Sequence, residues 1–215
     1  MLFRSQGAIP ADLMAEEKEK LTEQPGAQPL PLPQREWGAV GPASNAMRRL
    51  RFTIEFLECR PRLGETVAGW LFAEWFGEFG YSRQQTAALV RGRMSRTPPL
   101  ALVARAGPEA VGTVSLVPEA HPLRPGTVHC LAGLYVAPPW RGRGVGARLC
   151  RRAVREAGRL GIATLHLYTG DAERFFQRLG WHKIVDAVME RSRGLELAAF
   201  LGIDTGSAAV QAQST

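Results

Sequence analysis

The sequence is poor in lysine and cysteine and has no long apolar run. Only three of its 215 residues are lysines, so the formal net charge of +7 comes almost entirely from arginine. The arginines are spread along the chain rather than gathered in one tract, which argues against a nucleic-acid-binding protein. A basic surface of this kind favours small anionic partners such as phosphates and nucleotides.

The three cysteines are scattered and show neither a CxxC pair nor the Cys/His spacing of a zinc site. We therefore expect no metal, and reduced thiols in a cytoplasmic protein. No apolar stretch approaches the roughly 20 residues that span a bilayer. Residues 1–10 also lack the apolar core of a secretory signal. The sequence predicts a cytoplasmic protein with no membrane partner.

The two ends of the chain differ in composition from the middle. Residues 1–46 combine a charged run with a Pro/Gln-rich stretch, which cannot bury enough apolar surface to offset the entropy of ordering. From Gly206 the chain is small and polar. We expect disordered segments at 1–46 and 203–215, and one folded domain over 47–202.

Strand and helix patterns alternate within that domain. Period-two patterns and short apolar runs predict the strands, and 3.6-residue periodicity predicts the helices. The strands are expected at 51–58, 100–106, 110–117, 128–136, 162–168, 181–185 and 194–200. The helices are expected at 65–79, 82–94, 145–160 and 171–179. The fold class is therefore mixed α/β (α+β), with strand, turn, helix and strand at its centre.

The central turn, Arg141–Gly146, has the sequence RGRGVG. Glycines let backbone amides approach a ligand closely, and the start of a helix carries partial positive charge. The two arginines add guanidinium groups whose fork geometry suits phosphate. The turn is therefore expected to hold a phosphate or pyrophosphate.

Other kinds of phosphate site fit the spacing less well. The turn lacks the Gly-Lys-Ser/Thr end of a Walker A loop, and its glycines are spaced G-x-G-x-G rather than G-x-G-x-x-G. A dinucleotide site needs an acidic residue at the end of the next strand, whereas Asp171 lies three residues beyond Tyr168. A dinucleotide site and a tight turn without any ligand remain as alternatives.

Residues 134–146, LYVAPPWRGRGVG, resemble the coenzyme A signature of the GNAT acetyltransferase superfamily, Arg/Gln-x-x-Gly-x-Gly/Ala after a strand end. Arg141, Gly144 and Gly146 take the motif positions. Residues 172–181, AERFFQRLGW, resemble the second block of the family, A-x-x-F-Y-x-x-x-G-F. One helix and one strand separate the two blocks, as in the family.

The resemblance implies a three-layer fold with a mostly antiparallel sheet, splayed strands and helices on both faces. It implies acetyl-CoA as the acetyl donor, and an acceptor amine held by the first two helices and the loop at 121–129. The pantetheine arm would bind the strand backbone at Leu134, Tyr135 and Val136. The pyrophosphate would bind the turn at Arg141, Gly142, Arg143, Gly144, Val145, Gly146 and Ala147. The far side of the coenzyme would contact Asp171, Arg174 and Phe175.

Acetyl transfer to an amine needs a base for the amine, a polarised carbonyl and an acid for the leaving thiolate. In the family a tyrosine of the second block often supplies the acid, but Phe176 stands there and cannot donate a proton. Tyr168 and Tyr135 are the nearest replacements in sequence, with water as the alternative proton donor, and we take Tyr168 as the catalytic candidate. The candidate bases at the cleft edge are Glu119, His121 and His129.

Two functions stay open from the sequence. The first is an N-acetyltransferase that moves the acetyl group directly to an amine, on a small molecule or a protein N-terminus, in a ternary complex. The second is a non-catalytic acyl-CoA binding or sensing module that kept the coenzyme site and lost the acid at Phe176. The protein is expected to be a monomer or a homodimer.

Overall fold

The computed structural model describes residues 51–121, 125–191 and 194–206. Residues 1–46 and 207–215, where disorder is expected from composition, lie outside these ranges. The strands are β1 (Thr53–Phe56), β2 (Leu100–Ala106), β3 (Glu109–Ala120), β4 (Thr127–Val136), β5 (Thr164–Thr169), β6 (His182–Arg191) and β7 (Gly194–Asp204). The helices and helical turns are η1 (Leu57–Cys59), η2 (Pro61–Leu63), α2 (Gly64–Leu71), η3 (Phe72–Phe76), α3 (Arg83–Gly92), η4 (Pro138–Trp140), α4 (Val145–Arg159) and α5 (Glu173–Gln177).

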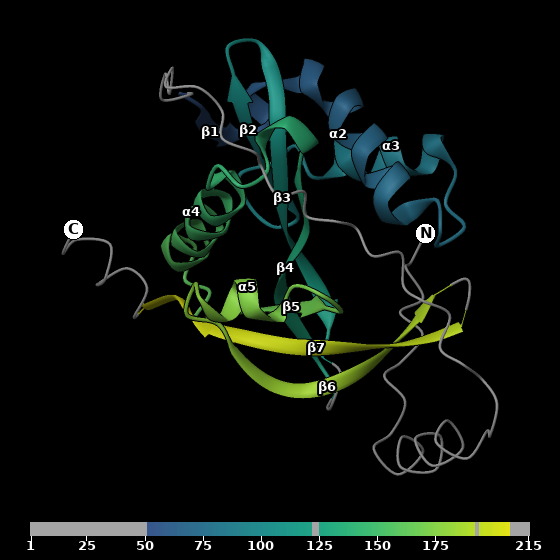
Figure 1. The fold of residues 1–215 in the computed structure, drawn as a ribbon, viewed down its shortest axis with the longest axis vertical. Coiled ribbons are helices and arrows are strands. Elements are labelled where there is room, and N and C mark those ends of the chain that lie inside the picture. Colours follow the sequence, from purple (N-terminus) through teal and green to yellow (C-terminus); the bar gives the residue numbers. More distant parts are fainter. Residues whose placement is uncertain (1–50, 122–124, 192–193, 207–215) are drawn as a thin grey trace, which may run out of the picture.

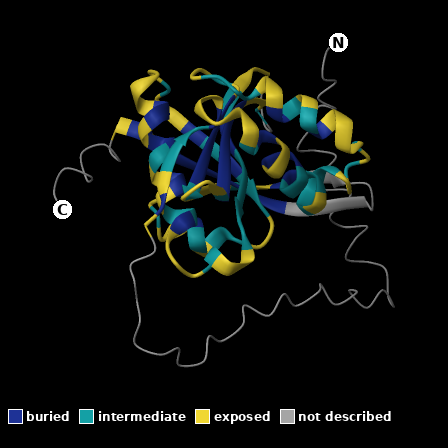
Figure 2. Ribbon diagram, turned by 90° about the horizontal axis from the view of Figure 1, so that it is seen from above, coloured by how far each residue is buried: buried dark blue, intermediate teal, exposed yellow. Residues whose placement is uncertain are grey.

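The strands form one sheet in the order β1-β2-β3-β4-β5-β7-β6, with helices on both faces. Helix α4 lies on one side of the sheet, and α2 and α3 lie on the other (Figure 1). Buried residues of α4, among them Val145 and Leu149, pack in a cluster with β2 and β3. On the opposite face Val67 and Leu71 of α2 pack against Val103. The buried positions concentrate in the strands between these layers (Figure 2), so the expected three-layer fold is confirmed.

Strands β4 and β5 are the parallel neighbours in an otherwise antiparallel sheet. They pair at two positions, His129 with Leu165 and Cys130 with His166. The register between β3 and β4 shifts just beyond, near Gly133, whose φ is +60°. Such a bulge bends its strand. From there to Val136, β4 runs on without pairing to β5, which confirms the expected splayed strands.

The helix expected over 65–79 has two parts. The α-helical part ends at Leu71, and η3 continues as a π-helical turn. The Gly77 N–H donates to the Phe72 carbonyl, five residues back, over 2.9 Å. A π-turn inserts about one residue into the helical repeat, so positions five apart come close to sharing a face. Trp70 and Trp75 therefore lie on the same side.

Strand β7 ends later than composition predicts. It continues to Asp204, past residue 203, where the disordered tail was expected to begin. Ile203 is buried, and the Thr205 hydroxyl donates to the Ile162 carbonyl over 2.6 Å. Ordered structure therefore continues a few residues past the expected boundary at 202, because these side chains pack against β5 and α4.

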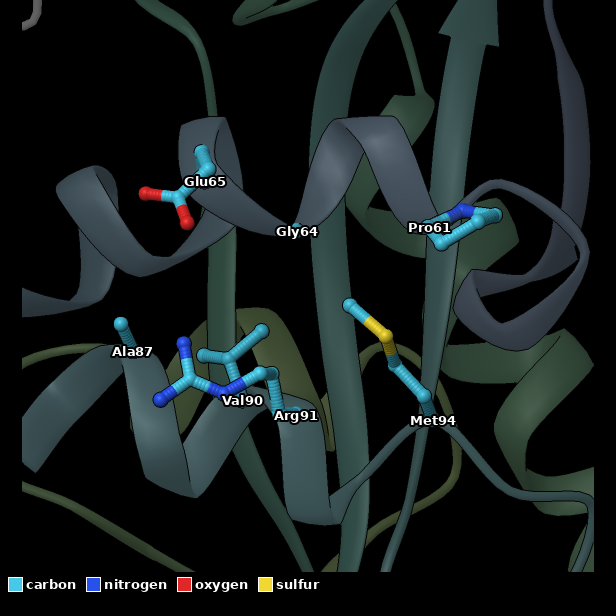
Figure 3. Close-up of a pocket in the computed structure, with 7 residues that line it drawn as sticks. All are labelled: Pro61, Gly64, Glu65, Ala87, Val90, Arg91 and Met94. Carbon is cyan, nitrogen blue, oxygen red and sulfur yellow. The ribbon is translucent and has the colours of Figure 1, made fainter.

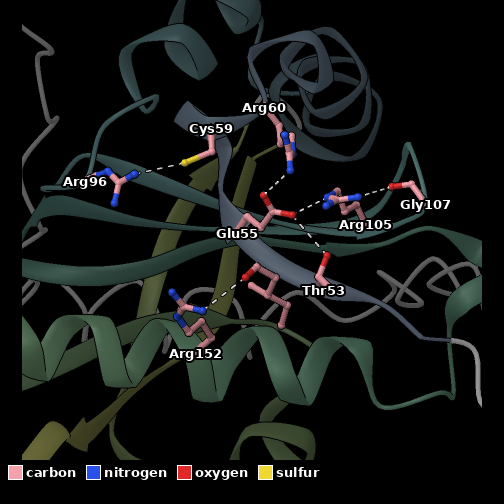
Figure 4. A network of polar contacts seen from close by, with 9 residues as sticks. Thr53, Glu55, Cys59, Arg60, Arg96, Arg105, Gly107 and Arg152 are labelled. Carbon is pink, nitrogen blue, oxygen red and sulfur yellow. Dashed lines mark hydrogen bonds and ion pairs between the residues drawn. The ribbon is translucent and has the colours of Figure 1, made fainter.

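Charged side chains anchor the edge strand β1. Glu55 accepts a hydrogen bond from Arg105 of β2 and pairs with Arg60, with 3.1 Å between Nη2 and Oε2 (Figure 4). Burial raises the pKa of Glu55, but the hydrogen bond and charge of Arg105, with the charge of Arg60, outweigh burial and lower it. From α4, Arg152 donates to the Ile54 carbonyl over 3.4 Å, so β1 is held from both sides.

Candidate active site

The glycine-rich turn connects the end of β4 to the start of α4. Gly142 and Gly144 have left-handed backbones, with φ of +70° and +77°. Residues with side chains are strained in this conformation. No atom lies within 4 Å of the position that a Cβ would take at either glycine. The turn therefore presents open backbone that a bulky anion can approach.

Helix α4 begins at this turn with Gly144 as its N-cap and without a side-chain cap. The first N–H groups of a helix have no partner within the helix, so those of Val145, Gly146 and Ala147 can donate to a ligand. The helix is 15 residues long and adds its partial positive charge at the same end. These features fit the pyrophosphate of coenzyme A.

Arg141 links the turn to β4. Its Nε donates to the Val136 carbonyl over 2.9 Å, and its guanidinium carbon lies 5.6 Å from the centre of the Tyr135 ring. A guanidinium has further N–H donors beyond Nε, and these can bind phosphate. The contact therefore orients a cation at the mouth of the turn.

The other residues expected to bind the coenzyme lie around this turn in different ways. Leu134 and Val136 pack toward the core under α4, and the edge of β4 that carries them is the one not paired with β5. The Phe175 ring reaches within 3.5 Å of the Cβ position at Gly146. Asp171 and Arg174 are exposed on either side of the start of α5. Of Asp171, Arg174 and Phe175, it is Phe175 whose side chain contacts the turn.

Tyr135 faces the opposite side of the sheet from Leu134 and Val136. It stacks on Trp70, with ring centres 5.0 Å apart and planes 29° apart, and Trp75 meets it edge-on at 6.5 Å. We call these three residues the aromatic wall. The π-turn η3 makes the wall possible, because it places both tryptophans on the face that meets β4.

Two of the four catalytic candidates, Glu119 and Tyr168, lie together. Glu119 of β3 and Tyr168 of β5 project from the α2/α3 face, as does Cys130 of β4, according to the strand registers. Burial raises the pKa of Tyr168, and the neighbouring Cys130 and Glu119 raise it further. Desolvation also raises the pKa of Glu119, which the charge of Arg93 opposes.

The two histidine candidates lie on opposite faces of the sheet, and His121 shares the face of Tyr168, because both rings contact Phe200. His129 pairs with Pro118 and Leu165, so it faces the α4 side, away from Glu119 and Tyr168. His121 follows the end of β3, and its ring lies edge-on to Phe200, 5.7 Å between centres. The structure therefore groups Glu119 with Tyr168 and leaves His129 on the other face.

Arg93, just after α3, is a site residue that the sequence did not reveal. Its Nη1 donates to the Ser115 hydroxyl over 3.2 Å. Burial lowers its pKa, and the charge of Glu119, which projects from the same face of the sheet, raises it. Arg93 belongs to no motif in an arginine-rich chain, and only the packing of α3 on β3 distinguishes it.

Phe176 occupies the family's tyrosine position and is part of the core. It is 5% exposed and meets Phe175 and Trp181 edge-on, with ring centres 5.0 Å and 5.9 Å apart. Its packing partners include residues of the cluster beneath α4. The position is therefore a packing site in this chain.

A pocket lies between α2 and α3 (Figure 3), and none of the predicted site residues lines it. It is lined by Pro61, Gly64, Glu65, Ala87, Val90, Arg91 and Met94. Within residues 51–121, 125–191 and 194–206, no group of three or more His, Cys, Asp and Glu side chains is placed to hold a metal ion. No helix in the described part of the chain is long and apolar enough to cross a membrane.

The fold, the splayed strands and the open glycine-rich turn fit an acyltransferase that uses an acyl-coenzyme A donor. The sequence profile of the acetyltransferase (GNAT) family matches residues 64–181, which include both motif blocks. The chain therefore belongs to the acetyltransferase (GNAT) family. It is an acetyltransferase, and acetyl-CoA is its acetyl donor.

Solved structures share this fold. An aminoglycoside 6'-N-acetyltransferase complexed with coenzyme A is 19% identical, with a TM-score of 0.57 over 71% of this chain and 97% of that chain. A variant of the spermidine N-acetyltransferase SpeG from Vibrio cholerae is 15% identical, with a TM-score of 0.57 over 73% and 95%. The putative acetyltransferase yncA from Salmonella typhimurium, with its cofactor acetyl-CoA, is 19% identical, with a TM-score of 0.52 over 72% and 94%. No curated protein matches the chain in sequence.

Proposed function

We propose that the protein is an N-acetyltransferase that moves the acetyl group of acetyl-CoA directly to an amine in a ternary complex. The grouping of Glu119 and Tyr168 carries the proposal. Both project from the α2/α3 face. Tyr168 lies on β5 two residues past its last pair with β4, where the strands separate, and Glu119 lies opposite Val128, before the first of those pairs. They therefore lie on either side of those pairs, and Tyr168 borders the place where the family resemblance puts the thioester.

The turn and its surroundings hold the coenzyme in this proposal. Acetyl-CoA supplies the acetyl group as an activated thioester. Backbone amides of residues 142–147 bind the pyrophosphate, assisted by Arg141 and Arg143. The edge of β4 at Leu134 and Val136, which does not pair with β5, binds the pantetheine arm. Phe175 packs against the start of α4, with Asp171 and Arg174 on the far side of the coenzyme. The open backbone at Gly142 and Gly144 supports this arrangement.

Glu119 acts as the base. The amine nitrogen forms its bond to the acetyl carbon as the bond from that carbon to sulfur breaks, and the proton released by the nitrogen goes to the Glu119 carboxylate. A carboxylate with a raised pKa is a better base near neutral pH than an ordinary one. Desolvation by neighbouring groups raises the pKa of Glu119 although the residue stays exposed, which supports this role.

Tyr168 stabilises the leaving sulfur. Its raised pKa keeps the phenol protonated, so it donates a hydrogen bond to the thiolate and retains its own proton. The thiolate then takes a proton from solvent, and Glu119 returns one, so no net proton is gained or lost by the protein. This assignment explains how the reaction proceeds with Phe176 at the usual tyrosine position.

Release of free thiol from acetyl-CoA, measured with a panel of amines, tests the proposal. We expect Glu119→Gln to lower turnover about 100-fold at neutral pH, the typical contribution of a general base. Tyr168→Phe should lower it less, because thiolates leave comparatively well unaided. Glu109→Gln and Tyr81→Phe serve as controls, since both residues lie outside the site.

Two results would contradict the proposed function. Full turnover in both Glu119→Gln and Tyr168→Phe would remove these residues from the mechanism. Tight coenzyme binding without turnover on any amine would favour the acyl-CoA binding module instead.

A further inference from the structure

One face of α4 carries a row of arginines. Its exposed members are Arg148, Arg151, Arg155 and Arg159, and Arg152 lies partly buried beside them. Residues three and four apart are neighbours on a helix, so these side chains form one row, about 17 Å long at a rise of about 1.5 Å per residue. The opposite face of α4 packs on the sheet. We call the four exposed residues the arginine face.

The charge of the arginine face is largely uncompensated. The carboxylate of α4 itself, Glu156, accepts a hydrogen bond from Nε of Arg152 over 2.6 Å, and its Oε1 lies 3.9 Å from Nη1 of Arg159. In the described part of the chain, no ion pair joins the other three residues of the arginine face to a carboxylate. Like charges three and four residues apart repel one another, so this face favours an anionic partner.

The N-terminal part of the chain joins the described fold beside this face. The described residues begin at Arg51, and the centre of the Phe52 ring lies 4.4 Å from the guanidinium carbon of Arg148. Two residues later the Ile54 carbonyl accepts a hydrogen bond from Arg152, which reaches from α4 to β1 (Figure 4). Residues 1–50 are therefore tethered at the Arg148 end of the arginine face.

The sequence of this tethered part contains an acidic segment. Residues 12–23, DLMAEEKEKLTE, carry five carboxylates and two lysines, a net charge of −3 in a chain whose overall charge is +7. Charged runs near a terminus commonly act as interaction segments. Residues 24–50 join the segment to β1, and a chain of that length spans up to about 90 Å, several times the length of the arginine face. The segment therefore has the charge and the reach to lie on this face.

We propose that residues 12–23 bind the arginine face of α4 in the same chain. Carboxylates of the segment pair with Arg151, Arg155 and Arg159, whose guanidinium forks suit carboxylates. The tether raises the effective concentration of the segment at this face above that of free anions of similar charge. The contact is electrostatic and lies at the surface, so salt weakens it. It does not depend on the acetyltransferase activity.

Carbodiimide cross-linking of the full-length protein tests the contact. The reagent joins a carboxylate to an amine that touches it, and arginine does not react. Arg155→Lys keeps the charge and introduces an amine into the arginine face, in a chain with only three lysines of its own. We expect mass spectrometry to find cross-links from position 155 to carboxylates of residues 12–23 within one chain. Arg91→Lys, at an exposed position of α3 on the other side of the sheet, is the matched control and should give none (Figure 1).

A change of charge in the segment separates electrostatic binding from chance encounters. The triple variant Glu16→Gln/Glu17→Gln/Glu19→Gln, combined with Arg155→Lys, leaves Asp12 and Glu23 as reactive carboxylates. We expect the cross-links at these two residues to fall at least fivefold in the triple variant. The same loss should follow when sodium chloride is raised from about 10 mM to about 1 M, because the screening length falls from about 30 Å to about 3 Å.

The cross-link between Lys183 and Glu173, whose Nζ and Oε2 atoms lie 3.7 Å apart, shows in each sample that the reagent worked. Where it forms and position 155 gives no cross-link to residues 12–23, the inference is overturned. Cross-links that join two chains, or that persist in the triple variant and at high salt, would also overturn it. If instead phosphatidylserine vesicles or duplex DNA bind the protein and lose affinity in Arg151→Gln/Arg155→Gln, without these cross-links, the face belongs to that partner.

Discussion

Arg141 donates from Nε to the carbonyl of Val136, 2.9 Å away, so the glycine-rich turn is joined to the last residue of β4. One side chain therefore connects the two places expected to hold the coenzyme, the turn and the strand edge.

Replacing Arg141 tests that connection. Arg141→Met removes a charge-assisted contact to phosphate and loosens the turn, so coenzyme A should bind about tenfold to 100-fold more weakly, in line with about 1.5–3 kcal/mol for such hydrogen bonds. Arg155→Met, an exposed residue midway along α4, is the matched control. Calorimetry with coenzyme A measures both variants. Equal affinity in the two would show that Arg141 has no part in coenzyme binding.

Gly144 allows a sharper test of the turn itself. Gly144→Glu places a carboxylate where we expect the pyrophosphate, so coenzyme binding should disappear. Gly107→Glu is the matched control, because Gly107 also has a positive φ, +59°, and open space around its Cβ position, but lies in the hairpin between β2 and β3. Both variants should lose a similar amount of stability, about 1–2 kcal/mol for a left-handed non-glycine residue. Retained affinity in Gly144→Glu would mean that the turn does not hold the coenzyme.

Phe176 is the position where family resemblance and packing disagree. Restoring the family's tyrosine with Phe176→Tyr should not raise turnover, because the new hydroxyl enters a side chain environment that is 5% exposed and built from rings. The variant should also be less stable by about 1–3 kcal/mol, the cost of burying an unpaired hydroxyl. Steady-state kinetics and thermal melts measure the two effects. A several-fold gain in turnover would show that the tyrosine position is still catalytic.

The pH profile of kcat/KM reports on Glu119. As the base, Glu119 must be ionised, so activity should fall as pH decreases through its pKa. Desolvation raises that pKa and the charge of Arg93 lowers it. Arg93→Met removes the lowering influence, so the acidic limb should move to higher pH, while Arg91→Met should leave it in place. The acceptor's own ionisation is common to all variants and cancels in the comparison. An unmoved limb in Arg93→Met would uncouple the two residues.

Local patterns in the sequence were sufficient to predict much of this fold. The turn at 141–146 was predictable because its glycines, its arginines and the following amphipathic helix are contiguous, and α4 begins at Val145 as expected. The strands around it followed from short apolar runs. These features depend on neighbours in the chain, which periodicity detects.

Features set by distant contacts were not predictable in this way. Whether Glu119 and His129 share a face depends on the register of β3 on β4, which no local pattern encodes. The π-turn η3 has no sequence signal of its own, although it positions Trp75 on Tyr135. Arg93 resembles the other arginines until α3 is packed on the sheet. Ile203 and Thr205 extend the domain because of their partners in β5 and the loop before it.

Strands β4 and β5 are joined by two residue pairs, fewer than any other two neighbouring strands of the sheet. The strands from β1 to β4 and those from β5 to β7 are thus two blocks, joined across this seam and by the core beneath α4. A coenzyme lying along the seam would contribute part of the missing connection between the blocks. Its binding would then raise the cooperativity of unfolding as well as the stability, which gains about 2.7 kcal/mol when the ligand is present at 100 times its Kd. The free enzyme would consequently open first along this line, and the donor would act as a structural component of the fold that it serves.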